Sequence, residues 1–397
     1  MQGHRAVFIN NQREARLYLE EIGVDPGAYP YLLPKAQYRC LKLKNISCPA
    51  AVIIKQEMLS KGGEAAIKRN ALTFTGETDV LLMGTLKHYD LLVEKLRVQP
   101  FGLKSLARDI ENILENLEEE NWSIALPGGR TLELQQRTLI MGILNVTPDS
   151  FSDGGRYLDP IDAVTRGIQM AEEGADIIDI GGASSRPDAK LADQEEERKR
   201  LLPVVKSLVA ENLLVSVDTF RADIARECLE MGAHIINDIG SLRMDSGLID
   251  VLSEYKAPLV VMHNRMQLDR GQPYQDLVAD IINDLRETMN RAQEAGIPEN
   301  CLIVDPGLGF GKTPEQNRIL VKHLGEFKSL GRPILIGASR KRFIGTTLNL
   351  DTDERLEGSL AVLSMAVMNG ASIVRVHDVK ESKRVVDMID AVRNENG

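Results

Sequence analysis

Cysteine is scarce in this chain, and its spacing is wrong for a metal or disulfide framework. Cys40, Cys48, Cys228 and Cys301 form no C-x-x-C pair, which argues against a zinc site and a disulfide scaffold. The chain has no apolar run of 18 residues, and its N-terminus lacks the pattern of a signal peptide. A protein of the reducing cytoplasm, with no membrane contact, fits these absences best.

Positive charge is also in deficit. The formal net charge is -10 and the isoelectric point is about 5.3, which argues against a general binder of nucleic acid or anionic membrane. Any anionic ligand must therefore be held by a local group of side chains. The length of 397 residues suffices for two domains, or for one large barrel with an addition.

From residue 138 onward, short apolar stretches alternate with longer amphipathic ones. Eight such stretches predict strands, at 138–145, 176–182, 213–219, 234–239, 258–263, 302–307, 333–339 and 372–378. Helices are predicted between them, as at 160–174 and 314–327, and a last helix at 381–394. Eight strand-then-helix units predict a (β/α)8 barrel, with an open doubly wound sheet as the alternative. A hairpin predicted at 121–134 would cover the bottom of the barrel.

Polar side chains follow nearly every predicted strand, at the end where barrel enzymes carry their active sites. A ring of polar strand ends is hard to explain by stability alone, so it predicts a binding site. Its members are Asn145, Asp218, Asn237, His263, Asp305, Ser339, Arg340, Lys341, Arg375 and His377.

Four of these side chains suit a flat heterocycle that has both N–H and C=O groups. Asp218 and Asp305 accept hydrogen bonds, Asn237 both donates and accepts, and Lys341 supplies a cation. An Asp–Lys ion pair across the barrel is the purely structural alternative.

Arg375 and His377 are two residues apart on the last predicted strand, so their side chains point the same way. Together they suit a phosphate group, although solvated residues of an edge strand would show the same pattern. The acidic loop 145–160 would repel a bare phosphate, so a divalent cation is expected, with Asn145 as an oxygen ligand. The segment 306–312, PGLGFGK, is not a phosphate-binding loop in the usual frame.

Several segments resemble dihydropteroate synthase, in order, over about residues 121–397. They are MGILNVTPDSFSDGG (141–155), GADIIDIGGASSRP (174–187), SVDTF (216–220), IINDI (235–239), DPGLGFGK (305–312), SRK (339–341) and RVHD (375–378). The resemblance implies a pterin-binding (β/α)8 barrel and a transferase of folate biosynthesis. The implied enzyme joins 6-hydroxymethyl-7,8-dihydropterin diphosphate to 4-aminobenzoate, uses Mg²⁺ and releases diphosphate. Sulfonamides would compete with 4-aminobenzoate for its pocket.

The resemblance also implies a role for each matching residue, here by its number in this chain. Asp218, Asn237, Asp305 and Lys341 would bind the pterin. Asn145, Arg375 and His377 would hold the diphosphate, with Mg²⁺ on Asn145. Asp153 and Arg186 would close over the reacting centre. Ser185, Pro187, Phe310 and Arg342 would form the aminobenzoate pocket.

Three positions depart from the family pattern. Ala183 removes a carboxylate from the second loop, Asp188 replaces a glycine, and Arg342 replaces a serine. We expect these changes to alter affinity for the second substrate and not the class of reaction.

Residues 1–120 resemble no family. Strands are predicted at 50–55 and 79–84, and amphipathic helices at 85–98 and 103–120, which together indicate a small α/β domain. An accessory or oligomerisation domain is the expectation, with a second enzyme as the alternative. We also expect a homodimer.

Two other functions are compatible with the strand ends. A barrel that binds methyltetrahydrofolate and passes on its methyl group would share the Asp and Asn positions, but would not need Arg375, His377 or the SRK segment. A non-catalytic pterin-binding protein is the second, and the altered second loop is its only indication.

Overall fold

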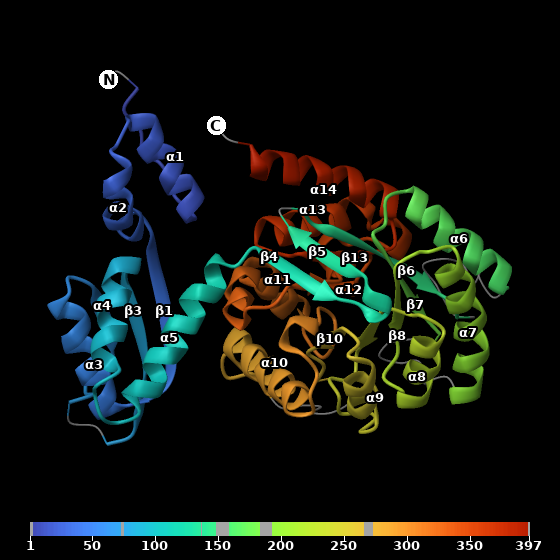
Figure 1. Cartoon of the computed structure of the whole chain (residues 1–397), viewed down its shortest axis with the longest axis horizontal. Helices are drawn as coiled ribbons and strands as arrows, with labels where there is room; N and C mark the ends of the chain where they lie inside the picture. The colour runs from blue at the N-terminus through green and yellow to red at the C-terminus, as the bar shows by residue number, and fades with distance from the viewer. Residues whose placement is uncertain are drawn as a thin grey trace. The chain divides into compact units, whose positions relative to one another are not determined.

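The computed structural model describes residues 3–72, 75–135, 137–147, 159–182, 193–265 and 273–395. The chain divides into two compact units, Met1–Glu118 and Glu119–Gly397, which are coloured blue to cyan and cyan to red in Figure 1. Each unit has its own hydrophobic core, so each is described by itself.

The larger unit is built on eight parallel strands. In sheet order they are β11 (Leu302–Asp305), β10 (Leu259–Met262), β9 (Ile235–Asp238), β8 (Val215–Asp218), β7 (Ile177–Gly181), β6 (Leu139–Asn145), β13 (Ile373–Val376) and β12 (Leu335–Ile336). A parallel bridge between Val304 and Ile334 joins the two ends of this order. The ring is therefore closed, which confirms the barrel and excludes the open sheet.

Helices surround the strands of this unit (Figure 1). They are α6 (Pro160–Glu172), α7 (Gln194–Ala210), α8 (Ala222–Glu230), α9 (Leu248–Tyr255), α10 (Leu277–Glu294), α11 (Pro314–Lys322), α12 (Arg342–Leu348), α13 (Leu356–Met368) and α14 (Val379–Asn394). The start of α11 is confirmed, because Thr313 is its N-cap and forms a reciprocal capping box with Gln316. The helix is shorter than predicted, and a 3-10 segment, Leu324–Leu330, follows it.

The predicted hairpin is confirmed as β4 (Asn121–Ala125) and β5 (Thr131–Gln135). Its apolar side chains, including Ile124 and Leu134, pack against residues at the beginnings of the barrel strands, such as Leu139 and Ile177. The hairpin therefore seals the bottom of the barrel, at the end opposite the predicted site.

The smaller unit has a three-stranded antiparallel sheet in the order β1 (Tyr38–Ser47), β3 (Glu77–Thr85), β2 (Glu64–Ile67). Its helices are α1 (Gln12–Ile22), α2 (Tyr29–Ala36), α3 (Cys48–Ser60), α4 (Leu86–Leu96) and α5 (Leu103–Glu118). The small α/β domain and the strand predicted at 79–84 are confirmed.

The strand predicted at 50–55 is wrong, because these residues belong to α3. Pro49 is at the first turn, where its fixed φ suits a helix. Ala51, Ile54 and Met58 are fully buried, at spacings of three and four residues. That helical periodicity extends beyond the short apolar run from which a strand was predicted.

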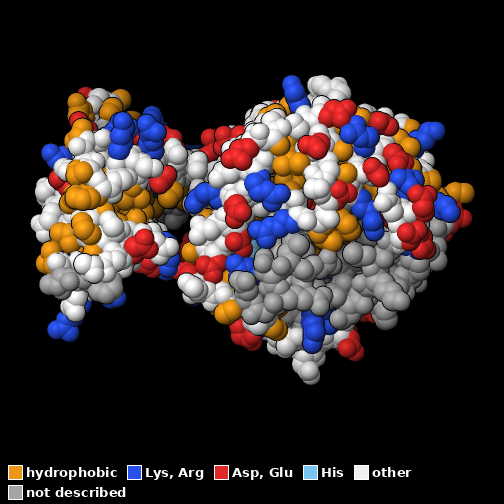
Figure 2. Space-filling view, turned by 90° about the horizontal axis from the view of Figure 1, so that it is seen from below, with side chains coloured by type: hydrophobic (Ala, Val, Ile, Leu, Met, Phe, Trp, Pro, Cys, Tyr) orange, Lys and Arg blue, Asp and Glu red, His pale blue; other side chains and the backbone are white. Residues whose placement is uncertain are grey.

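No helix of the described residues is both long and apolar enough to span a membrane. On the face of the larger unit seen in Figure 2, basic and acidic side chains are interspersed.

We predict that Ile124→Ala lowers the free energy of unfolding of the barrel by about 2–4 kcal/mol, because it leaves a cavity in the seal. Ser123→Ala is the matched control, since this neighbouring side chain is exposed and donates to Glu133 on the surface. Urea unfolding of both variants gives the comparison. Equal stability of the two would mean that the hairpin does not close a packed core.

Candidate active site

The barrel register brings the polar strand ends to one level. Asn145 pairs with Gly181, Gly181 with Asp218, and Asp218 with Asn237, across four neighbouring strands. Gly181 keeps the space between its neighbours open, since a Cβ there would lie 3.5 Å from Asn145 Oδ1 and 3.8 Å from Asp218 Oδ2. The side chains predicted from separate segments therefore share one mouth.

Arg375 lies at the centre of this mouth. Its Nε donates to Asp179 Oδ2 at 2.6 Å, and its Nη2 donates to Asp218 Oδ2 at 2.9 Å. Asn237 Nδ2 donates to the same oxygen of Asp179 at 3.0 Å. The other oxygen, Asp179 Oδ1, is buried with no hydrogen-bond partner among the described residues. This orphan acceptor needs a donor from a ligand or water.

Two carboxylates and one guanidinium thus lie together in a mostly buried site. Burial raises the pKa of Asp218 to about 7, although the charge of Arg375 opposes this rise and that of Asp179 adds to it. Burial also works to lower the pKa of Arg375, and attraction to the two carboxylates raises it by more. Asp218 thus titrates near neutrality while Arg375 stays charged.

Asp305, at the end of β11, and Lys341, just before α12, form another part of the mouth. Burial raises the pKa of Asp305, and Lys341 and a hydrogen bond of 2.7 Å from Gly307 N oppose that rise. Burial lowers the pKa of Lys341 to about 8, against the attraction of Asp305. Lys341 Nζ donates to Leu308 O and lies 4.8 Å from the centre of the Phe310 ring. Phe310 is therefore joined to the predicted pterin residues.

His377 follows the end of β13 and binds Ser339, with 3.0 Å between its Nδ1 and Ser339 Oγ. The next residue, Asp378, accepts from Arg340 Nε at 3.0 Å. The SRK and RVHD segments are thus joined residue to residue, at Ser339–His377 and Arg340–Asp378. Among the described residues, Arg375 donates to two carboxylates inside the barrel, whereas His377 contacts Ser339.

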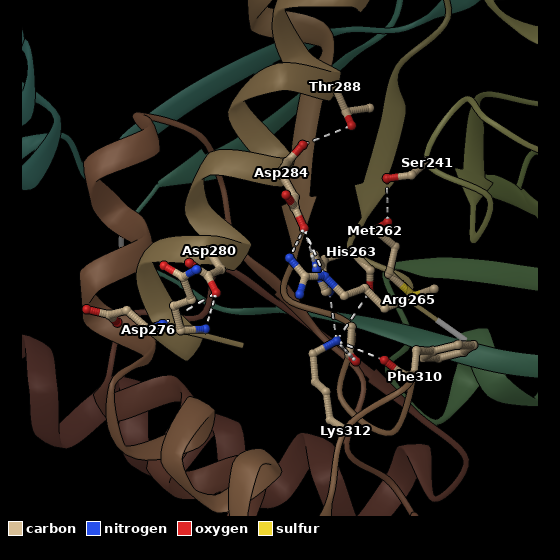
Figure 3. A network of polar contacts seen from close by, with 12 residues as sticks. Ser241, Met262, His263, Arg265, Asp276, Asp280, Asp284, Thr288, Phe310 and Lys312 are labelled. Carbon is tan, nitrogen blue, oxygen red and sulfur yellow. Dashed lines mark hydrogen bonds and ion pairs between the residues drawn. The ribbon is translucent and has the colours of Figure 1, made fainter. Parts of the chain in front are cut away.

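His263 does not contribute to the mouth, contrary to the expected ring. Its Nε2 lies 3.1 Å from Asp284 Oδ2 on α10, and Lys312 Nζ lies 2.9 Å from its Nδ1 (Figure 3). Burial lowers the pKa of His263 to about 4. The ring is therefore neutral, with its proton on Nε2 and its Nδ1 accepting from Lys312.

Two other predicted site residues lie in described parts of the chain, and four do not. Asn145 is half-buried at the end of β6, and Arg342 is exposed at the first position of α12. Asp153, Ser185, Arg186 and Pro187 lie outside the described residues, as do the departures Ala183 and Asp188. The described residues contain no group of three or more His, Cys, Asp or Glu side chains that could hold a metal.

Asp179 is the main residue that the prediction missed. It lies inside β7, in a segment treated as apolar, and it is fully buried. The available signal was an acid within a strand covered on both faces, where a charge needs a partner. The partner, Arg375, is 196 residues away in the chain, so spacing alone could not reveal it.

Comparison with known proteins adds independent findings. A family model described as "Pterin binding enzyme" matches residues 141–377. Dihydropteroate synthase of Bacillus subtilis is 45% identical over 268 residues, which cover 67% of this chain and 92% of that protein. Xanthomonas albilineans dihydropteroate synthase, solved with 4-aminobenzoic acid, matches with 40% identity and a TM-score of 0.64, covering 69% of this chain and all of that one.

A longer relative also matches the N-terminal unit. A probable bifunctional folylpolyglutamate synthase/dihydropteroate synthase of Halobacterium salinarum is 38% identical over 389 residues. The match covers 97% of this chain and 46% of that protein.

The raised pKa of Asp218 predicts that the site lowers the stability of the fold in a pH-dependent way. Its pKa is about 7 in the fold, against 3.8 as the ordinary value, so its contribution to stability falls as the pH rises from about 4 to 7. Asp218→Asn removes this loss. The melting temperature of the variant relative to wild type should therefore rise over that interval and level off above it.

Asp162→Asn is the control, because this carboxylate is exposed on α6. Differential scanning calorimetry without substrate, from pH 4 to 8, measures both. A constant difference for Asp218→Asn across that range would contradict the titration.

Proposed function

The chain belongs to the dihydropteroate synthase family of pterin-binding enzymes, and on this basis we propose which side chains hold each substrate. The reaction is the transferase step of folate biosynthesis, which joins 6-hydroxymethyl-7,8-dihydropterin diphosphate to 4-aminobenzoate. The products are 7,8-dihydropteroate and diphosphate. The proposal concerns the role of each side chain in this reaction.

The pterin ring is bound by Asp218, Asn237, Asp305 and Lys341, and Asp179 joins them. The observation that carries this assignment is the orphan acceptor Asp179 Oδ1, buried beside Arg375 and Asn237. A pterin has amino and ring N–H groups that can donate to carboxylates and a carbonyl that can accept from Lys341. A ring with both kinds of group satisfies this set better than water does.

The diphosphate is held by Asn145, Arg375 and His377. A guanidinium carries five N–H donors, and the two ion pairs of Arg375 use only part of them. His377 follows the end of the same strand, two residues after Arg375. Asp153 and Arg186 complete this proposal from the first two loops.

Mg²⁺ is proposed beside Asn145. The carbonyl oxygen of Asn145 is a suitable ligand, and Mg²⁺ commonly binds to one or two protein oxygens, substrate phosphates and water. When bound, the ion would neutralise part of the charge on the diphosphate.

The aminobenzoate pocket is assigned to Ser185, Pro187, Phe310 and Arg342. The contact between Lys341 and the Phe310 ring supports it, since it puts an aromatic face beside the proposed pterin site. Arg342, exposed at the start of α12, is the candidate for the carboxylate of 4-aminobenzoate.

The mechanism requires no protein nucleophile. The C–O bond from the pterin methylene to the diphosphate breaks first, and the electron-rich dihydropterin ring stabilises the positive methylene. The aniline nitrogen of 4-aminobenzoate then attacks and loses a proton. The side chains position the substrates and stabilise the departing negative charge.

A homodimer is part of the proposal. Met365 and Met368 on α13, and Met388 and Val392 on α14, are each more than half exposed, and the two helices pack against each other. Exposed apolar side chains grouped on neighbouring helices are typical of an interface. Residues 1–118 are proposed as an accessory domain.

Arg375→Ala tests the anion site. Loss of one preorganised donor should lower kcat by about 10²–10³, measured as diphosphate release with and without 4-aminobenzoate. Arg226→Ala is the control, since Arg226 is on α8 and pairs with Glu254 on the surface. Wild-type turnover in Arg375→Ala would exclude Arg375 from the site. Release that does not depend on 4-aminobenzoate would contradict the transferase itself.

The barrel should function without the smaller unit. All proposed site residues lie in Glu119–Gly397, and the hairpin that seals the bottom is included. A fragment of residues 119–397 should unfold cooperatively and keep turnover within about tenfold. Its molar mass reports the assembly state. A folded but inactive fragment would assign part of the active site to residues 1–118.

A further inference from the structure

The turn after β11 has glycine at three positions where the backbone favours glycine. Gly307, Gly309 and Gly311 have φ values of 69°, 83° and 68°, which side chains other than glycine rarely adopt. A Cβ on Gly307 would lie 2.0 Å from His263 O. The turn therefore lies directly against the end of β10, and several of its backbone carbonyls face inward.

Lys312 fills the space behind this turn. Its Nζ lies 2.9 Å from Gly307 O, 3.0 Å from Phe310 O and 2.9 Å from His263 Nδ1 (Figure 3). A fourth acceptor, His263 O, is more distant at 3.4 Å. An ammonium has three N–H donors, enough for the three nearest acceptors. Burial lowers the pKa of Lys312 well below its ordinary value, and the three acceptors compensate part of that cost.

The acceptor His263 is itself held in place. Its Nε2–H donates to Asp284 on α10, and Arg265 Nη2 donates to the same carboxylate oxygen at 2.9 Å. Lys312 thus links the turn to the end of β10 and, through His263, to α10. None of these groups has a role in the reaction described above.

A second lysine binds the same turn from the side of the active site. Lys341 Nζ donates to Leu308 O, and a Cβ on Gly309 would lie 3.3 Å from Lys341 Cδ. If Lys341 turns to a pterin carbonyl, its bond to Leu308 weakens. Lys312 then still donates to this turn, at Gly307 O and Phe310 O.

We propose that Lys312 is a positioning residue for the pterin, which holds the Gly307–Phe310 turn in place when Lys341 engages the substrate. It touches neither substrate. This inference rests on the proposed pterin site. It predicts that the loss of Lys312 weakens the bound state more than it weakens the free protein.

The test uses the full-length chain with Lys312→Met, which keeps the apolar stem and removes the ammonium. Binding of a pterin analogue without diphosphate is measured by calorimetry, and steady-state kinetics follow. We expect the dissociation constant and the pterin KM to rise about tenfold or more, since donors to three acceptors are lost. The value of kcat at saturating pterin should stay within about threefold.

Asp390→Asn controls for a purely structural effect. Asp390 accepts from Thr138 N at 2.6 Å and Oγ1 at 3.1 Å, ahead of the first barrel strand, so its loss should lower stability at the opposite end from the site. Pterin affinity of this variant should stay within about twofold of wild type. An equal loss of affinity in both variants would overturn the positioning role.

Lys312→Ala allows a rescue experiment whose result would not change if Lys312 had only a structural role. Ethylammonium added to the variant should restore pterin affinity in proportion to its concentration, with no effect on Asp390→Asn. If Lys312→Met does not fold, Lys312→Gln, which still has two N–H donors, replaces it and should lose affinity by a smaller factor.

The outcomes separate the two proposals. Wild type that does not bind the pterin analogue would overturn the proposed pterin site. Wild type that binds it, together with Lys312 variants that bind equally well, would overturn the role of Lys312 alone. Loss of kcat at unchanged pterin affinity would also overturn it.

Discussion

The guanidinium of Arg375 lies between Asp179 and Asp218, in the barrel mouth, and three strands depend on that contact for their functional side chains. Two carboxylates therefore share one cation in a mostly buried site. This is costly for an empty protein, and it raises the pKa of Asp218. A ligand with several N–H donors relieves the cost. The same buried carboxylates that weaken the fold therefore favour binding of a pterin.

The site has two parts, which are positioned by different means: the strand ends of the barrel and a glycine-rich turn. Asn145, Gly181, Asp218 and Asn237 are fixed by strand register. The segment after β11 instead has its shape from glycines, from Asn317 Oδ1, which accepts from Gly309 N, and from Lys312 and Lys341. Under the proposed role of Lys312, a substrate that draws Lys341 away from Leu308 O leaves Lys312 to hold the turn.

Particular residues show where prediction succeeded and failed. Asp218, Asn237, Asp305, Lys341 and Arg375 could be predicted to lie together because polar residues at strand ends share one face of any such barrel, and their role in binding stays a prediction. Asp179 was missed because its partner is distant in sequence. His263 was misplaced because a strand end does not determine whether its last side chain turns to the mouth or to a helix. The strand predicted at 50–55 was wrong because a short apolar run fits either period.

The sequence by itself determined the closed barrel, its sealed bottom and the types of group at its mouth, because periodicity and strand-end chemistry are local properties of the chain. Only the tertiary structure decided which charges pair: Arg375 with two acids, His263 with Lys312 and Asp284, and Arg340 with Asp378. Each of these contacts joins separate strand–helix units. Their energies depend on distance and burial, and neither quantity exists until the barrel closes.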